Sequence, residues 1–258
     1  MSATLRLAVF ALLLFYQGSA LFLEQNCGKS SVFSPAPWLV KIRPELSSNI
    51  TCTGTLINER FVLTAASCID YQTELIVRLG EIDGTLQNSS KLQYEEIYVA
   101  RALIHRSYSS ESHQYNIALL RLKTSVVYKK NIQPICIDVN VGKVPKAPTF
   151  EIEKKKNEEP KKNKAGIMKR FLNWFLSLFG VREPRPDVIL PPQPIAVGWP
   201  LTKQINESAL FHQYGILSHR NSESKKDVYT DVMAYVNWIT PLALDVHITM
   251  APNTDFDF

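Results

Sequence analysis

The first half of the chain alternates short apolar runs with turn-forming residues. Between residues 38 and 138 the runs rich in Val, Ile and Leu are "WLVKI", "TGTLI", "RFVLTAA", "ELIVRLG", "YEEIYVARALIH", "IALLRL" and "IQPICI". Short strands repeated in this way are typical of a β-sandwich or a β-barrel. A parallel α/β architecture would need long amphipathic helices between the strands, and this stretch shows no such pattern.

The pattern changes over residues 143–193 and then returns to β character. "VPKAPTFEIEKKKNEEPKKNKAG" is charged, is interrupted by prolines and has no apolar face, so it predicts a solvated linker. Strand-like runs reappear in "IAVGW", "FHQYGILS" and "DVYTDV", and residues 233–239 predict a terminal helix. The apolar pattern therefore predicts an all-β protein that carries an insertion and ends in a helix.

The insertion contains one segment with a strong helical pattern, "GIMKRFLNWFLSLFG" at residues 166–180. On a helical wheel its polar residues fall within an arc of about 100°. The opposite, wide apolar face includes Phe171, Trp174, Phe175 and Leu178. Such a face needs a partner, and three are open: the protein's own β-structure, which we place first, a membrane surface, or a groove on another protein.

The formal net charge of +5 is concentrated in one segment. Residues 143–185 hold twelve Lys and Arg against five Asp and Glu, a local net charge of +7, so the rest of the chain carries −2. The basic character thus belongs to the insertion rather than to the folded body. Because aromatic and basic residues do not interleave, no nucleic acid partner is expected.

The N-terminal residues have the pattern of a targeting signal. Arg6 precedes an apolar run at residues 7–16, and Gly18-Ser19-Ala20 supplies small residues for cleavage. We therefore expect a signal peptide over residues 1–20 and a secreted protein. Four cysteines in an oxidising compartment favour disulfides over a metal site, and no metal or cofactor is expected. Three Asn-x-Ser/Thr sequons predict glycosylation at Asn49, Asn88 and Asn206.

Several of these runs resemble those of a known family when they are taken in order. The blocks are "TCTGTLINERFVLTAASC", "VRLGEID", "NIALLRL", "NIQPICI", "AVGWP", "YGILSH" and "VYTDVMAYVNWI", preceded by "EQNCGKS". They resemble the trypsin/chymotrypsin-like serine proteases (peptidase S1) over most of residues 24–240, outside the insertion. The resemblance implies one S1 domain over residues 21–258, with an all-β, chymotrypsin-like double β-barrel and a C-terminal helix.

The resemblance also implies how the cysteines pair. Cys52 and Cys68 match the disulfide of the family's histidine loop, and Cys27 and Cys136 match the pair that tethers a light-chain segment. The family's disulfides further along the chain have no cysteines here. We therefore expect the second barrel to be incomplete and to carry the basic and helical insertion.

The family's catalytic residues are replaced at the positions that match. Its general base falls on Ser67, whose hydroxyl has no pKa near neutrality, and its orienting aspartate falls on Asn116. The second change alone costs about 10⁴ in rate in a working triad. The family's G-D-S-G-G-P turn has no counterpart, because only "PLTKQINESALFHQY" separates Trp199 from Gly215 and Ser208 lacks glycine neighbours. No I-V-G-G activation site follows Cys27 either. The resemblance therefore implies an inactive homologue.

We accordingly expect a secreted, non-catalytic serine protease homologue that binds extracellular proteins, including proteases or their substrates. Such a protein would be a cofactor, decoy or regulator in an extracellular proteolytic cascade. One alternative is a serine-type endopeptidase of which this chain is a truncated form, and another is membrane-surface binding through residues 166–180. A substitute base from among the five histidines is not favoured, because no nucleophile turn is present for it to activate; the histidines are His105, His113, His212, His219 and His247.

Overall fold

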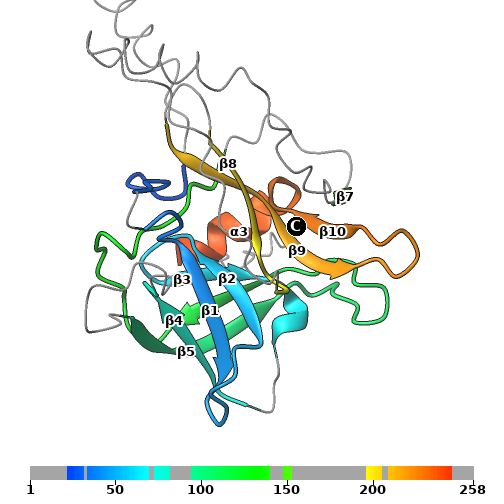
Figure 1. Ribbon diagram of the computed structural model, residues 1–258, viewed down its shortest axis with the longest axis horizontal. Coiled ribbons are helices and arrows are strands. Elements are labelled where there is room, and N and C mark those ends of the chain that lie inside the picture. The colour runs from blue at the N-terminus through cyan, green and yellow to red at the C-terminus, as the bar shows by residue number, and fades with distance from the viewer. Residues whose placement is uncertain are drawn as a thin grey trace, which may run out of the picture.

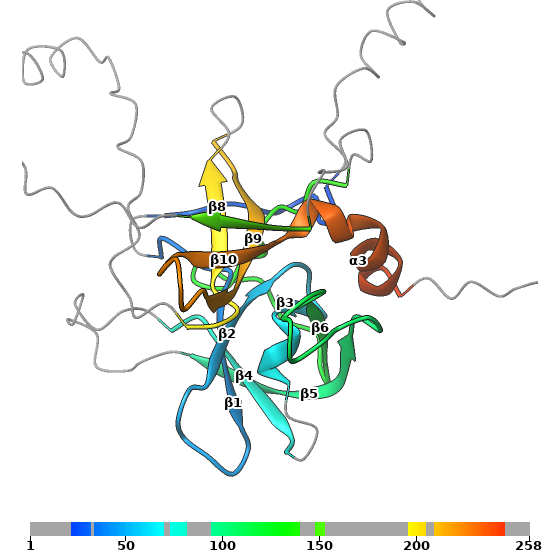
Figure 2. The same cartoon turned by 90° about the vertical axis from the view of Figure 1, so that its right-hand side faces the viewer.

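The structure is a computed structural model, and it describes residues 22–31, 34–69, 73–81, 94–139, 148–152, 196–204 and 209–245. These residues form two β units, a closed six-stranded barrel and a four-stranded sheet, followed by a C-terminal helix. The sheet stacks above the barrel with the helix at one side (Figures 1 and 2). The trypsin-like, mostly β fold expected from the sequence is confirmed.

The barrel is built from the apolar runs of the first half of the chain. Its antiparallel strands follow the order β1-β2-β3-β6-β5-β4, and β4 pairs back with β1 to close it. Almost every residue of β2, β3, β4 and β6 is buried, which explains why these strands appear as nearly continuous apolar runs. The strands are β1 (Leu39–Pro44), β2 (Cys52–Leu56), β3 (Phe61–Thr64), β4 (Leu75–Leu79), β5 (Glu95–Ile104) and β6 (Ala118–Leu122).

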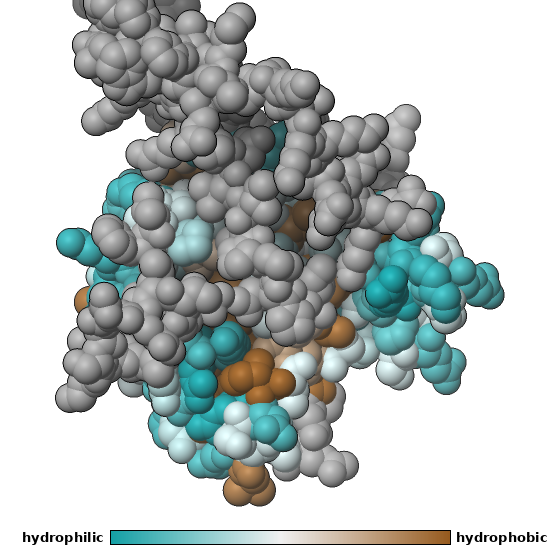
Figure 3. Space-filling model, viewed as in Figure 1, coloured by the Kyte–Doolittle hydropathy of each residue, from teal (hydrophilic) through white to brown (hydrophobic). Residues whose placement is uncertain are grey.

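The second β unit is an antiparallel sheet with the strand order β7-β10-β9-β8. Within the described ranges this sheet does not close into a barrel. Its strands are β7 (Thr149–Ile152), β8 (Pro200–Gln204), β9 (Phe211–Arg220) and β10 (Asp227–Asp231). The turn between β9 and β10, residues 221–226, projects to one side and has a polar surface (Figures 1 and 3).

The C-terminal helical region joins the two β units. Asp231 caps the 3₁₀-helix η3 (Val232–Tyr235) by accepting a hydrogen bond from the Met233 N–H at 2.9 Å, and α3 (Val236–Ala243) follows directly. The Asn58 side chain in the barrel donates a 2.8 Å hydrogen bond to the carbonyl of Ala243. Buried residues of the barrel, of β9 and of α3 belong to one hydrophobic cluster, so the helix packs against the barrel core.

Three local predictions differ from the structure. Residues 149–152 of the expected linker form β7, because pairing with β10 brings Phe150 into a stack on Tyr229 with ring centroids 5.9 Å apart. In the expected strand "IAVGW", the described residues 196–199 contain a turn at Gly198, whose φ of +85° ends extended structure, and the strand begins at Pro200 instead. "IQPICI" contains isolated bridges rather than a strand, among them the parallel bridge between Cys136 and His212.

Several predictions fall outside the described residues. They are the signal peptide at 1–20, the sequons at Asn88 and Asn206, and the helix at 166–180 with Phe171, Trp174, Phe175 and Leu178. In the part of the chain that the structure describes, no helix is long and apolar enough to cross a membrane. Asn49, the remaining sequon, is exposed between β1 and β2.

Candidate functional site

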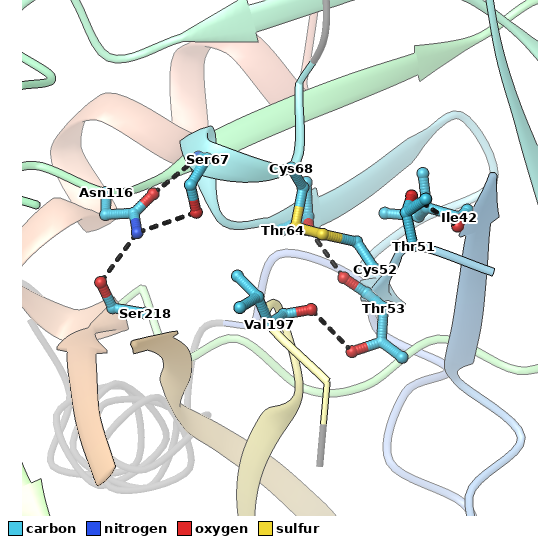
Figure 4. The surroundings of a disulfide bond; sticks show 10 residues. All are labelled: Ile42, Thr51, Cys52, Thr53, Thr64, Ser67, Cys68, Asn116, Val197 and Ser218. Atoms are coloured by element: carbon cyan, nitrogen blue, oxygen red, sulfur yellow. Dashed lines mark hydrogen bonds between the residues drawn. A yellow bond between two sulfur atoms is a disulfide. The ribbon is translucent and has the colours of Figure 1, made fainter. Parts of the chain in front are cut away.

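Ser67 lies in a short turn that a disulfide holds in place. Strand β3 ends at Thr64, and the 3₁₀-helix η1 (Ala66–Cys68) follows with Ser67 exposed between two buried neighbours. The disulfide from Cys68 to Cys52 of β2 closes the loop, with 5.8 Å between the two Cα atoms (Figure 4). Closing a loop of this length stabilises the folded state by about 3 kcal/mol in the chain-entropy model. The Ser67 backbone is therefore fixed to the barrel.

Asn116 is fully buried just before β6, and its side chain connects the barrel to the second sheet. Its Oδ1 accepts a 2.8 Å hydrogen bond from the Ser67 N–H. Its amide nitrogen donates to the Ser67 hydroxyl at 3.1 Å and to the Ser218 hydroxyl of β9 at 2.8 Å (Figure 4). The Thr230 hydroxyl of β10 donates to the Asn116 carbonyl at 3.1 Å. Both polar groups of the Asn116 side chain thus have partners within the fold.

The cluster formed by Ser67, Asn116 and Ser218 contains only hydroxyl and amide groups. Neither group gains or loses a proton near neutral pH, so the three side chains alone cannot carry out general acid–base chemistry. The phenol of Tyr108 also reaches Ser67: burial raises the pKa of Tyr108, and the hydrogen bond with Ser67 opposes that rise. Tyr108 is therefore also protonated at neutral pH.

His219 contacts the cluster through the buried Ser218. Nδ1 of His219 and the Ser218 hydroxyl share a 3.1 Å hydrogen bond. Burial lowers the pKa of His219, the nearby His113 lowers it further, and Glu151 acts in the opposite direction. A serine beside an imidazole has the composition of a nucleophile and its base. However, Ser218 is only 1% exposed and receives the Asn116 amide, so in this conformation its hydroxyl is not accessible to a substrate carbonyl.

The other histidines contact different groups. His113 stacks on His219, and His105 packs among the rings of Tyr115, Tyr235 and Trp238. His212 is buried edge-on against Phe22. His247 lies outside the described residues. Among the residues that the structure describes, no group of three or more His, Cys, Asp or Glu is placed to hold a metal ion.

The second disulfide fixes the N-terminal segment beside the start of β9. Cys27 is bonded to Cys136 with 4.8 Å between the Cα atoms. Next to it, the Gly28 N–H donates to the Pro134 carbonyl at 2.7 Å, and the Phe211 N–H donates to the Gly28 carbonyl at 2.9 Å. The two disulfides are the pairs that the resemblance implied.

The loop that leads into β8 also docks on the barrel close to this site. The Thr53 hydroxyl of β2 donates to the Val197 carbonyl at 3.2 Å, and the Thr64 hydroxyl donates to the Thr53 carbonyl at 2.7 Å (Figure 4). The Thr53 N–H donates to the same Val197 carbonyl at 2.9 Å. The following residue, Gly198, approaches so closely that a Cβ there would lie 1.9 Å from the Thr53 carbonyl oxygen. Only glycine fits such an approach without displacing the backbone.

Comparison with protein families identifies the chain. The profile of the trypsin family, described as "Trypsin", matches residues 25–154, which include the whole barrel, the Ser67 turn, Asn116 and β7. The chain belongs to the trypsin family. Strands β8–β10, which contribute Ser218 to the site, follow the matched region.

Curated members of the trypsin family align over less than half of this chain. Serine proteinase stubble of Drosophila melanogaster is 34% identical over 43% of this chain and 15% of its own length. Serine protease grass of the same species is 32% identical over 46% of this chain and 35% of its own length. Inactive CLIP domain-containing serine protease A28 of Anopheles gambiae is 33% identical over 47% of this chain and 33% of its own length. The matched region thus spans about a third or less of each relative.

Sequence reasoning identified two members of the cluster and missed the rest. Ser67 and Asn116 were singled out by resemblance, but their contact with each other and with Ser218 was not foreseen. A signal for Ser218 was present, because it lies within the block "YGILSH", next to its last residue. The stack of His113 on His219 had no signal in the pattern, since the two residues belong to different β units.

Proposed function

We propose that this trypsin-family chain is a secreted, non-catalytic serine protease homologue that acts by binding other proteins. Its partners would be extracellular proteases or their substrates, and its role that of a cofactor, decoy or regulator in a proteolytic cascade. The observation that carries the proposal is the Asn116 side chain, which donates to the hydroxyls of Ser67 and Ser218. By the family resemblance, Ser67 and Asn116 occupy the positions of the general base and of its orienting aspartate.

The chemistry of these two positions supports a loss of catalysis. The general base must take a proton from the nucleophile and return it to the leaving amine, which a serine hydroxyl cannot do near neutrality. A neutral amide also cannot stabilise an imidazolium. These arguments hold even if a nucleophile were supplied by residues outside the described part of the chain, where Ser208 lies.

The names of the relatives are compatible with a non-catalytic member of the family and also supply the second candidate function. One relative carries the word inactive in its name, so the family includes members described in that way. Stubble and grass are named as a serine proteinase and a serine protease. The second candidate is therefore a serine-type endopeptidase, in which this sequence would be part of an active protein.

Active-site labelling separates the two candidates. The purified chain, secreted from a eukaryotic host, is treated with a fluorophosphonate probe, which reacts with activated serine hydroxyls, and bound probe is located by peptide mass spectrometry. An active trypsin-family protease handled in parallel is the positive control. The proposal predicts no labelled serine in this chain. Stoichiometric labelling at any serine would contradict it and would support the endopeptidase.

A further inference from the structure

The loop between β5 and β6, residues 105–117, is held in a strained conformation. His113 and Tyr115 both have φ values of +54°, in the left-handed region that residues with a Cβ rarely adopt. Histidine is among the residue types that tolerate this region better, whereas a bulky tyrosine is not. Such conformations persist only where the surrounding contacts enforce them. The contacts made by these two side chains are therefore the ones that keep the loop in shape.

Both strained residues are held through their rings. Tyr115 stacks on His105 at the start of the loop, with centroids 5.1 Å apart and 7° between the ring planes. His113 stacks on His219 of β9, with centroids 4.5 Å apart and 23° between the planes. The first contact lies within the loop, whereas the second joins the loop to the other β unit. Loss of the second contact would therefore loosen the part of the loop around His113, while Asn116 at the end of the loop stays bonded to Ser218 and Thr230.

The stack of His113 on His219 is coupled to the candidate site by short contacts. His219 shares a hydrogen bond with Ser218, and Ser218 accepts the Asn116 amide. Asn116 directly follows the strained Tyr115 in the chain and holds both the N–H and the hydroxyl of Ser67. A displacement of the loop would thus reach the exposed Ser67 turn through Asn116.

We propose that the stack of His113 on His219 is a proton-sensitive contact that holds the part of the 105–117 loop around His113 against β9 at neutral pH and releases it in acid. Two neutral imidazoles stack favourably, whereas two imidazolium rings at this separation repel each other. The proposal concerns the conformation of the loop, so it does not depend on the catalytic status of the chain.

Burial and the neighbouring His113 favour the neutral form of His219 against the pull of one nearby carboxylate. Glu151 of β7 attracts a proton to His219, but its carboxylate is also engaged by the Asn221 side chain at 3.2 Å. Burial, followed by the proximity of His113, outweighs this attraction and lowers the pKa of His219. On the loop itself, Arg106 also disfavours a proton, because burial and then this guanidinium lower the pKa of His105. The remaining charged residue of the loop is the exposed Glu111.

The direction of the pH effect follows from this balance. The ordinary pKa of a histidine is about 6.5, and in the closed loop the pKa of His219 is lowered from that value. The closed state is therefore fully favoured above about pH 6.5 and loses stability as the pH falls below that value. Each unit of difference in pKa changes the closed-to-open ratio by up to about tenfold.

Amide hydrogen exchange of the full chain at pH 7.5 and pH 5.5, corrected for the intrinsic rates, tests the proposal. The Ser109 N–H, which bonds the Gln114 carbonyl across the loop, reports on the closed state, and the Leu56 N–H, which bonds Trp38 within the barrel, is the internal reference. We expect protection of Ser109 to fall, by up to about tenfold for each unit of pKa difference, with Leu56 unchanged. Equal protection of Ser109 at both pH values would overturn the proposal.

Three substitutions assign the effect to the stack. His219→Phe keeps a ring but removes the proton, so the loop should stay protected at pH 5.5. His113→Asn tolerates the left-handed conformation but removes the stack, so protection at pH 7.5 should already match that of the unsubstituted chain in acid. His105→Phe is the matched control: it changes a loop histidine outside the stack and should keep the pH response. A response abolished by His105→Phe, or retained in His219→Phe, would overturn the proposal.

Discussion

The six-stranded barrel and the four-stranded sheet differ in how they are held together. The barrel closes on itself through the pairing of β1 with β4 and is stapled by the disulfide between Cys52 and Cys68. Neither disulfide lies within the second sheet, and in the described ranges the sheet does not close. The sheet is connected to the barrel by Asn116, by the loop at Gly198 and by the segment at Gly28. The barrel is therefore the self-sufficient unit, and the sheet depends on docking to it.

The largest expected effect is the loss of unfolding free energy when a disulfide is removed, and its size differs between the two disulfides. Replacing Cys27 and Cys136 by alanine removes a crosslink with a sequence separation of 109. In the chain-entropy model this lowers the free energy of unfolding by about 4.7 kcal/mol, against about 3 kcal/mol for Cys52 and Cys68. Urea unfolding of both double variants measures the difference. Because Cys27–Cys136 lies beside the start of β9, we expect its loss to expose the sheet to proteolysis first. Cleavage of the barrel and of the sheet at the same rate in this variant would contradict the expectation that the sheet is the more dependent unit.

Gly198→Ala should undock the sheet while leaving the barrel intact. A Cβ there meets the Thr53 carbonyl oxygen at 1.9 Å in a backbone with a φ of +85°. Steric overlap and left-handed strain together should cost about 2–4 kcal/mol. Gly215→Ala is the matched control, because its Cβ would meet Phe150 Cζ at 3.1 Å and the ring can adjust. Hydrogen exchange should rise in β8–β10 of the first variant alone. A similar rise in both variants would contradict the proposed role of the Gly198 contact.

Asn116→Ala should weaken the junction by about 1–3 kcal/mol, the usual cost of leaving buried polar groups without partners. Asn116→Asp should cost less, since the Ser67 N–H already donates to this side chain. The hydroxyls of Ser67 and Ser218, which accept from the Asn116 amide, can rotate to donate to a carboxylate. Chemical denaturation of both variants, each against the unsubstituted chain, gives the two values. Asparagine at this position would have no structural role in the junction if the alanine variant were as stable as the original.

The smallest expected effect is the loosening of the sheet in mild acid. His212 of β9 is buried, and burial lowers its pKa against the opposing effect of Asp138. A pKa lowered in the folded state means that stability is complete above about pH 6.5 and is lost as the pH falls below that value. Urea unfolding between pH 7.5 and 5.0 should show this decline, and His212→Phe should reduce it. An identical decline in the variant would exclude His212 as its source.

The barrel was predictable from sequence because its strands are buried on most positions and appear as apolar runs. Strand β7 was not, since only four residues pair and they stand next to the charged stretch that begins at Glu153. Its stability depends on β10, and a partner strand leaves no trace in the local pattern. The same reason explains why a strand was wrongly predicted at Gly198. The turn there depends on a close contact with Thr53, which the local sequence does not show.

The candidate site was predictable only in part. Resemblance marked Ser67 and Asn116, but their contact spans 49 residues of sequence, and the contact of Asn116 with Ser218 spans 102. Contacts at such separations follow from the docking of the two β units rather than from any local pattern. The pairing of His113 with His219 has the same origin and requires the three-dimensional structure.

Amide hydrolysis by the purified chain tests the central claim most directly. The chain is incubated at neutral pH with a mixture of peptide amide substrates, with and without prior treatment by a serine-blocking reagent, beside an active trypsin-family protease. We predict that hydrolysis by this chain stays at the uncatalysed rate and does not change on treatment, because Ser67 and Asn116 cannot move a proton near neutrality. Hydrolysis that stops when one of the chain's own serines is blocked would contradict the account.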